Sequence, residues 1–470
     1  RRPLVHRLLY NTLKAEESSA QWRRTSSAIL GLNGNTPSTV AKFVEHNSQC
    51  VGASVACRIL IEMSICVCPK NGDEQISDIE LEHLIAKVAL VVRFGGLSDA
   101  IRFNALKPEL KISPLGDVLV EDDFGNFVVE PMLERVVGEN FVAASAKQAK
   151  NYEEAEIVPE TESKIDADFW KIWTDEFGFN LDEARNIIGA LEDIGLSEGS
   201  LVLELTEGEF VENVVSGQVS EAVARAFWST FLLLSRDNWE TVPDGYHIKD
   251  IYPWKYGRRL SIVTRPILGM DVDGFEKAVI APTILRRGFA YVFDGAFNGS
   301  LDQDFFKTPK MRNDWWGVAS EGHTFNAGVA QKVADQGWHV RKEIKLEEIL
   351  NTKLDKNYGD VDVLAWNDTE NKVYLMECKD LSAARNYSEI AAQLSDYQGV
   401  GKKDKLRKHL DRVSVAEENL AKIAKFCGKS NPEIVSCLIC SGVVPMQFSK
   451  SKALENTFVG SVEEFFGQRQ

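Results

Sequence analysis

Asp360 or Asp362, with Glu377 and Lys379, in the last third of the chain, has the residue types and the alternating spacing expected of a site for metal-assisted phosphodiester hydrolysis. Glu377 and Lys379 are two residues apart in an apolar run, and residues two apart in a strand share a face. Two carboxylates that converge repel each other unless a hard cation such as Mg²⁺ neutralises them. Such a cation makes a water easier to deprotonate and shields charge on a phosphoryl group, while a neighbouring ammonium orients the water.

Two strands joined by a polar turn must position these residues. The runs 359–366 (GDVDVLAW) and 372–380 (KVYLMECKD) are rich in β-forming residues and flank such a turn, which predicts a hairpin. If the hairpin brings the ends of both strands together, either Asp360 or Asp362 lies beside Glu377, with a lysine next to it.

At these residues the sequence resembles the PD-(D/E)xK, or restriction-endonuclease-like, nuclease superfamily. The resemblance covers about residues 315–466. It consists of a helix, a strand with an Asp after a glycine, and a strand that ends in Glu-x-Lys: residues 320–336, Gly359 to Asp362, and Glu377-Cys378-Lys379. It implies a C-terminal α/β domain with a mixed central sheet flanked by helices.

The resemblance also implies a role for each residue. Asp362 and Glu377 would hold Mg²⁺ or Mn²⁺ with help from the Cys378 backbone carbonyl, and Lys379 would serve the attacking water. Asp360 is the alternative metal ligand. Asp362 is preferred because the family spacing from the glycine puts the Asp there.

A helix predicted at 384–397 carries Gln393 and Tyr397, which resemble the Gln-x-x-x-Tyr element of the RecB-type branch of this superfamily. Residues four apart share a helix face, so these two side chains are expected to contact DNA or to orient the active-site lysine. We place Gln393 with the catalytic residues and Tyr397 with the nucleic-acid-binding residues.

The first helix departs from the family pattern. Many relatives carry a Glu just after an apolar anchor, where this chain has Asn326 after Phe325. Glu321 lies one turn earlier, and His323 resembles the upstream metal-binding His of some RecB-type enzymes. Either of them would complete the site, and we rank Glu321 first.

A basic run follows on a predicted helix with an apolar stripe. It consists of Lys402, Lys403, Lys405, Arg407, Lys408 and Arg412. The first five are expected to follow a nucleic-acid phosphate backbone beside the site. The alternative is an ordinary solvated helix face.

The length of 470 residues suits two or three domains, and the predicted fold class is multidomain. The expected parts are a mostly helical domain with a β-hairpin, an acidic linker, an α+β domain and the nuclease-like domain: residues 1–150 (hairpin near 112–132), 151–168, 169–310 and 311–470. The hairpin turn is placed at 122–126 (DDFGN), so the kinase-like triplet in it is interpreted as a turn.

The segment 252–259 (YPWKYGRR) interleaves aromatic and basic residues, as nucleic-acid stacking surfaces do. We interpret it instead as aromatics packed in a core or an interface, with the arginines paired to carboxylates.

The net charge of −16 comes from 54 basic and 70 acidic residues, which argues against a chain whose whole surface coats nucleic acid. Residues 321–470 hold 21 basic and 22 acidic residues, so the acidity belongs to the first two thirds. A surface that faces a polyanion is therefore expected at the C-terminal end.

No stretch reaches the ~18 uninterrupted apolar residues of a membrane-spanning helix, because the best candidates contain Arg58, Glu62 and Arg225. Eight cysteines are few for this length and no signal-peptide pattern is present, so we expect a cytoplasmic protein with reduced thiols and no membrane partner. The chain begins with Arg1 rather than Met, which suggests a fragment or a processed chain, so that an upstream domain could carry further activities.

The expected function is hydrolysis of DNA phosphodiester bonds with Mg²⁺ or Mn²⁺, in restriction, defence against foreign DNA or repair. Residues 1–310 would then select substrate, gate the site or bind a protein partner. Two alternatives stay open: a non-catalytic module that keeps the fold to bind nucleic acid or to dock a protein, and a nuclease directed at RNA.

Overall fold

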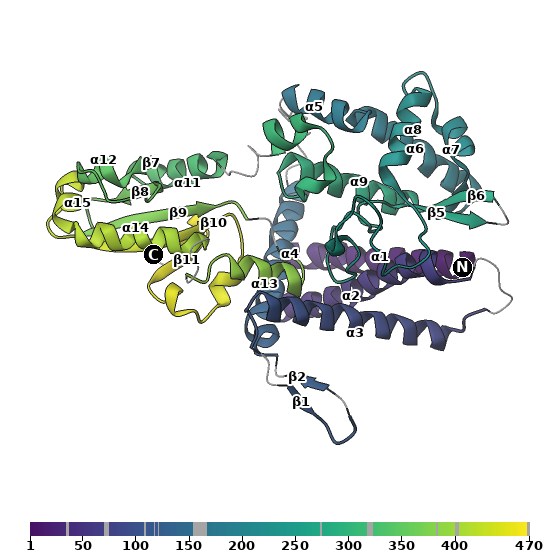
Figure 1. Cartoon of the computed structure of the whole chain (residues 1–470), viewed down its shortest axis with the longest axis horizontal. Coiled ribbons are helices and arrows are strands. Elements are labelled where there is room, and N and C mark those ends of the chain that lie inside the picture. Colours follow the sequence, from purple (N-terminus) through teal and green to yellow (C-terminus); the bar gives the residue numbers. More distant parts are fainter. Residues whose placement is uncertain are drawn as a thin grey trace. The chain divides into compact units, whose positions relative to one another are not determined.

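The computed structural model describes residues 1–33, 37–69, 75–107, 110–116, 118–120, 122–153, 167–272, 275–316, 323–381, 384–399 and 404–467 (Figure 1). The chain forms two compact units, and each is assembled from two separate stretches of sequence. Unit 1 consists of Arg1–Gly95 and Val137–Ser320. Unit 2 consists of Gly96–Val136 and Glu321–Gln470.

These units differ from the consecutive domains suggested by the sequence. Residues 96–136 fall in the same unit as the residues after 320, and not with the rest of the predicted domain 1–150. The physical reason is packing, because Leu97 and Leu106 belong to the same buried apolar cluster as Ile390. The predicted linker 151–168 lies mostly outside the described residues.

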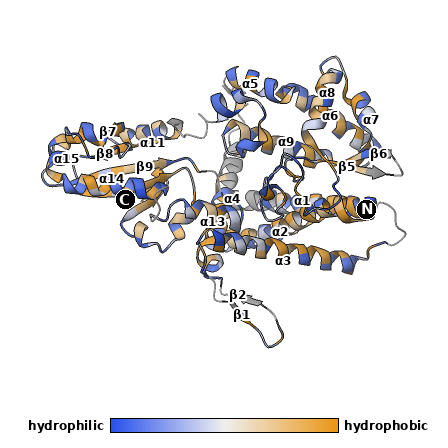
Figure 2. Cartoon of the chain, in the orientation of Figure 1, coloured by the Kyte–Doolittle hydropathy of each residue, from blue (hydrophilic) through white to orange (hydrophobic). Residues whose placement is uncertain are grey.

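Unit 1 begins with long helices, as the apolar spacing predicts. These are α1 (Arg2–Asn33), α2 (Pro37–Val67) and α3 (Asp78–Arg102). Helix α3 begins in unit 1 and ends in unit 2, and α4 (Glu130–Glu153) begins in unit 2 and ends in unit 1. Apolar and polar bands alternate along α3 (Figure 2).

Helix α2 contains the one stretch of the described residues, Val40–Val67, that is long and apolar enough to cross a membrane. Its surroundings are those of a core helix. Ile61 is fully buried, Arg58 pairs with Glu16 of α1, and Glu62 pairs with Arg258.

The second stretch of unit 1 combines helices with a small sheet. The helices are α5 (Ala167–Phe177), α6 (Leu181–Glu198), α7 (Glu207–Val214), α8 (Glu221–Phe231), α9 (Pro282–Phe297) and the short turns η2 (Ile248–Asp250), η3 (Gln303–Phe305) and η4 (Lys310–Trp316). The strands are β3 (Leu203–Leu205), β4 (Leu232–Leu233), β5 (Ile267–Val272) and β6 (Phe275–Ile280), in the order β3-β6-β5-β4. The described part of residues 169–310 thus contains both helices and strands.

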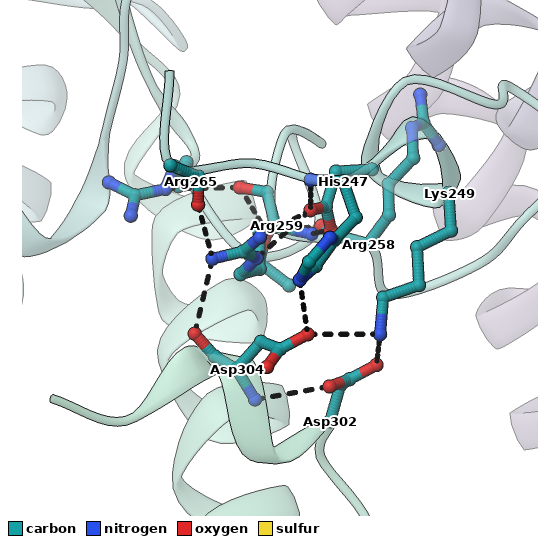
Figure 3. Close-up of polar contacts among 10 residues, drawn as sticks. His247, Lys249, Arg258, Arg259, Arg265, Asp302 and Asp304 are labelled. Atoms are coloured by element: carbon teal, nitrogen blue, oxygen red, sulfur yellow. Dashed lines mark hydrogen bonds and ion pairs between the residues drawn. The ribbon is translucent and has the colours of Figure 1, made fainter. Parts of the chain in front are cut away.

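The loop that contains residues 252–259 is held by polar contacts, of which those around Arg259 are drawn in Figure 3, and by a pair of stacked rings. Arg258 pairs with Glu62, and Arg259 lies 2.6 Å from an Asp250 carboxylate oxygen. The rings of Tyr252 and Trp254 stack 4.6 Å apart. The arginines are therefore satisfied by carboxylates, in agreement with the structural interpretation of this segment.

Unit 2 is built on a mixed five-stranded sheet. Its strands are β7 (His339–Lys345), β8 (Asp360–Trp366), β9 (Lys372–Lys379), β10 (Glu433–Cys440) and β11 (Thr457–Gly460), in the order β11-β10-β9-β8-β7. The pairs β7-β8 and β8-β9 are antiparallel, and β9-β10 and β10-β11 are parallel. The hairpin predicted from 359–366 and 372–380 is thus present as β8 and β9.

Helices cover both faces of this sheet. Side chains of a strand point to opposite faces, and each face forms an apolar cluster with the helices that cover it. One face packs against α11 (His323–Asp335) and α16 (Val462–Gly467). The other packs against α12 (Leu346–Leu350), α14 (Lys405–Glu418) and α15 (Leu420–Cys427). The remaining elements are α13 (Tyr387–Ser395), η5 (Pro445–Phe448) and η6 (Lys452–Leu454).

The early stretch of unit 2 contains a hairpin, but its position differs from the prediction. Strands β1 (Leu110–Ile112) and β2 (Val118–Val120) pair with each other, so the turn lies near Gly116 and not at 122–126. Residues 127–129 are helical, within η1 (Gly125–Val129).

The predicted turn residues begin a helix instead. The Asp122 carboxylate accepts a 2.7 Å hydrogen bond from the Gly125 N–H, which is a helix-capping contact. Phe124, Val128 and Met132 are buried at helical spacing. Asp and Gly serve helix starts as well as turns, so the turn signal was ambiguous.

Candidate active site

The strands β8 and β9 separate at the residues singled out from the sequence. Their pairing ends at Val363 and Met376. Beyond that point β8 stays paired with β7 as far as Asp360, and β9 stays paired with β10 as far as Lys379. Asp362 and Glu377 are the first residues after the last shared pair, so their side chains lie where the two strands part.

The structure brings the two carboxylates and the lysine together. The Lys379 ammonium lies 2.8 Å from Glu377 Oε1 and 3.7 Å from Asp362 Oδ2. Glu377 is buried, and the other two side chains are partly exposed. Asp360 makes no ion pair with Lys379 among the described residues, so the geometry favours Asp362 as the acidic residue of β8.

The Cys378 backbone faces the same gap. Its N–H donates a 2.8 Å hydrogen bond to Asp362 Oδ2. The carbonyl of the next residue, Lys379, accepts from Ser441 on the β10 side. Because the N–H and C=O of one strand residue point to the same side, the Cys378 carbonyl points toward the gap between β8 and β9.

Helix α14 adds two side chains that the sequence did not identify. Arg412 donates from Nη2 to Glu377 Oε2 and from Nη1 to the Asp360 carbonyl at 2.7 Å. His409 Nδ1 lies 3.9 Å from Glu377 Oε2, and its Nε2 is 3.0 Å from the Ser436 hydroxyl. Both side chains are buried.

A signal for these residues was present in the sequence. Leu406, His409, Arg412 and Ala416 recur at three- and four-residue intervals, which places them on one helix face with the apolar residues. A charged residue on the apolar face of a helix indicates a buried partner. The basic run predicted from the sequence includes Arg412, although this side chain is buried.

Burial and charge set the ionisation of the site. Burial, together with the charge of Glu377, raises the pKa of Asp362. Burial also raises the pKa of Glu377, but the charges of Arg412 and Lys379 outweigh it, so that pKa is lowered. Burial lowers the pKa of Lys379, and the two carboxylates reverse this and raise it. Burial lowers the pKa of His409 to about 4, so this imidazole is neutral at neutral pH.

Gln393 and Tyr397 lie on and just after α13. Gln393 is half-buried. Tyr397 is 1% exposed within an apolar cluster, and its hydroxyl makes no hydrogen bond among the described residues. The Tyr397 ring is covered by protein, and its contact with nucleic acid stays a prediction.

The candidates on the first helix fall at the edge of the described region. Glu321 lies outside the described residues. His323 is the first residue of α11, and its side chain also lies outside them. Asn326 is buried on the same helix as Val329, which packs against the sheet.

The basic run contains both exposed and buried side chains. Lys402 and Lys403 lie outside the described residues. Lys405 and Arg407 are about half exposed, and each pairs at 2.9 Å with a neighbouring aspartate. Lys408 is exposed. These three side chains are exposed, whereas Arg412 is buried.

The donors around the gap fit a divalent cation. Among the described residues no three or more His, Cys, Asp and Glu side chains gather as a metal site. Asp362, Glu377 and the Cys378 carbonyl nevertheless offer three oxygen donors, which Mg²⁺ prefers. Burial and the charge of Glu377 raise the pKa of Asp362, and a bound cation would oppose both effects.

Comparison with known proteins identifies a family. A family model described as anti-phage protein Upx-like matches residues 1–466, which include both units and every residue of the site. No match was found among the curated proteins or among the solved structures. The chain therefore belongs to the Upx-like family of anti-phage proteins.

Proposed function

We propose that this anti-phage protein is a metal-dependent nuclease that hydrolyses DNA phosphodiester bonds. The observation that carries the proposal is the convergence of Asp362, Glu377 and Lys379 at the point where β8 and β9 part. The mixed sheet with helices on both faces supports the restriction-endonuclease-like fold that the sequence resembles. The Upx-like match favours foreign DNA as the substrate, encountered in the cytoplasm.

Each group has a role in this proposal. Asp362, Glu377 and the Cys378 carbonyl would hold Mg²⁺ or Mn²⁺. The bound cation supplies a Lewis acid that polarises the scissile phosphate and eases deprotonation of water. Both carboxylates raise the pKa of Lys379, so its amine stays protonated. The ammonium would then donate a hydrogen bond to the attacking water or to a phosphate oxygen on which negative charge builds.

Substrate contacts fall to the exposed cations of the first turn of α14. Lys405, Arg407 and Lys408 expose their charged ends there. Phosphate contacts of this kind bind without regard to sequence and weaken as salt rises. Residues 1–320 carry most of the net charge of −16, and this acidity disfavours binding of random DNA elsewhere on the protein.

The test is cleavage of supercoiled plasmid, linear duplex, single-stranded DNA and structured RNA by the full chain with Mg²⁺ or Mn²⁺. Asp362→Asn and Lys379→Met should each lower the rate by about a hundredfold or more. The matched controls are Asp368→Asn in the exposed turn of the same hairpin and Lys372→Met at the start of β9. They should cut as the wild type does. Metal-independent cutting, or cutting that survives Asp362→Asn, would refute the proposal, and preference for RNA would change the substrate class.

A second candidate is a non-catalytic module that binds nucleic acid or docks a protein. The observation in its favour is that both Glu377 oxygens already contact cationic side chains, Lys379 and Arg412. A site that balances its own charge in this way is also what a purely structural ion-pair network looks like. This candidate predicts binding that Lys379→Met leaves unchanged and no cleavage with any divalent metal.

A further inference from the structure

Arg412 reaches across the opening between the two strands that carry the site. One end of its guanidinium binds Glu377 of β9, and the other binds the backbone carbonyl of Asp360 at the start of β8. A planar guanidinium can hold two partners in fixed directions, which a flexible ammonium does not.

The backbone is shaped to admit this side chain. Gly359 has a φ of +78°, and a Cβ built there would lie 3.2 Å from Arg412 Nη1. Any other residue at 359 would be strained by its φ and would crowd the guanidinium. The glycine three residues before Asp362 therefore makes room for an arginine from a helix that follows much later in the chain.

The two carboxylate oxygens of Glu377 have different partners. Arg412 takes Oε2, and Oε1 faces the Lys379 ammonium, which in turn lies 3.7 Å from Asp362. With Oε2 fixed from the α14 side, the carboxylate cannot rotate freely about its own axis. Oε1 is thereby held on the side of Glu377 where Lys379 lies, and Lys379 also contacts Asp362.

We propose that Arg412 is a positioning residue that holds Glu377 in the orientation needed to bind a divalent cation together with Asp362. This inference rests on the proposed function, since it concerns the same site. It adds a residue from α14 to a site that the sequence assigned to β8 and β9 alone. Arg412 contacts neither the cation nor the substrate in this scheme.

Electrostatics alone predicts the opposite effect of removing Arg412. A guanidinium next to the site repels a cation, so its loss by itself would tighten cation binding. Positioning predicts that its loss weakens binding, because Glu377 is no longer held. Partners of metal ligands typically change metal affinity by about 10–100-fold when they are mutated. The sign of the change therefore separates the two roles without any measurement of cleavage.

The experiment measures Mn²⁺ affinity of the full chain by calorimetry and by the manganese electron paramagnetic resonance signal, for wild type, Arg412→Lys and Arg412→Met. Asp362→Asn defines the signal that belongs to this site. Arg258→Met is the matched control, because it also breaks a buried arginine–glutamate pair, but in unit 1. Thermal unfolding without metal reports how much each variant loses in stability.

We expect Arg412→Met to weaken Mn²⁺ binding by about tenfold or more, Arg412→Lys to weaken it less, and Arg258→Met to leave it unchanged. Should Arg412→Met fail to fold, Arg412→Lys decides, since it keeps the charge and loses the two-ended contact. Unchanged or tighter binding in the folded Arg412 variants would overturn the inference and leave the proposed function standing. Absence of any Asp362-dependent Mn²⁺ binding in the wild type would overturn both.

Discussion

The Tyr387 hydroxyl donates a 2.9 Å hydrogen bond to the Asp122 carboxylate, across 265 residues of sequence. Tyr387 is the first residue of α13, the helix that carries Gln393. The next residue, Ser388, donates a 2.6 Å hydrogen bond to the buried Asp99. The start of α13 is thus tied by two carboxylates to the early stretch of unit 2.

A fragment that begins after residue 320 should therefore not fold on its own. It would lack Leu97, Leu106, Phe124 and Met132, which are buried in one cluster with α13. Each such side chain contributes about 1.5–3 kcal/mol when buried, so together they approach the whole stability of a domain, about 5–15 kcal/mol. We expect residues 321–470 to bind the dye ANS and to lack a cooperative thermal transition. Residues 96–136 supplied in the same cell should restore solubility, and a soluble, cooperatively folding 321–470 would contradict this account.

Gly359→Ala should disturb the site as well as the fold. The positive φ costs an alanine about 1–2 kcal/mol, and the new methyl crowds Arg412. Gly337→Ala is the control, since its φ of +81° imposes the same strain with no atom within 4 Å of the added Cβ. Gly359→Ala should lose at least as much stability in urea unfolding as Gly337→Ala. Mn²⁺ affinity should fall on the order of tenfold in Gly359→Ala alone, and equal affinities in the two variants would count against the role given to Arg412.

Tyr397→Phe should leave stability unchanged or raise it by about 1 kcal/mol. The Tyr397 hydroxyl is buried and has no hydrogen-bond partner among the described residues, and an unsatisfied buried polar group costs about 1–3 kcal/mol. Burial also raises the pKa of this phenol, so it stays protonated. Urea unfolding followed by tryptophan fluorescence measures the change. A loss of 2 kcal/mol or so would reveal a partner for the hydroxyl.

Stability should fall as the pH drops from about 7 to about 5, and His409 should account for much of this. Its pKa is about 4 in the folded protein, against 6.5 for an exposed histidine. Between these values the unfolded chain takes up a proton that the folded protein does not, so acid favours unfolding by on the order of 2 kcal/mol at pH 5. In His409→Gln this contribution should vanish, whereas His339→Gln, at a half-exposed histidine, should keep it. A steep fall that persists in His409→Gln would assign the effect to other groups.

Local patterns predicted the centre of the site well. The hairpin of β8 and β9 and the grouping of Asp362, Glu377 and Lys379 follow from alternation along two adjacent strands, which depends only on near neighbours in sequence. The preference for Asp362 over Asp360 came from the family spacing, and the contacts of Lys379 support it.

What the sequence missed depends on pairing between distant segments. Arg412 was read as a surface charge because its partner, Glu377, is 35 residues away on another element. Residues 96–136 were assigned to the N-terminal domain because their apolar partners lie nearly 300 residues later. Propensity and periodicity describe which face of an element is apolar, and they leave open what covers it.

The two-stretch construction of unit 2 has a consequence for biosynthesis. Residues 96–136 leave the ribosome before residues 137–320, and translation at about 5–20 residues per second separates them from the sheet strands by roughly ten to forty seconds. During that interval unit 1 can fold, while the apolar side chains of residues 96–136 lack the later residues that cover them. A nascent chain that has not yet passed Arg412 therefore has an incomplete candidate site, whatever the state of unit 1.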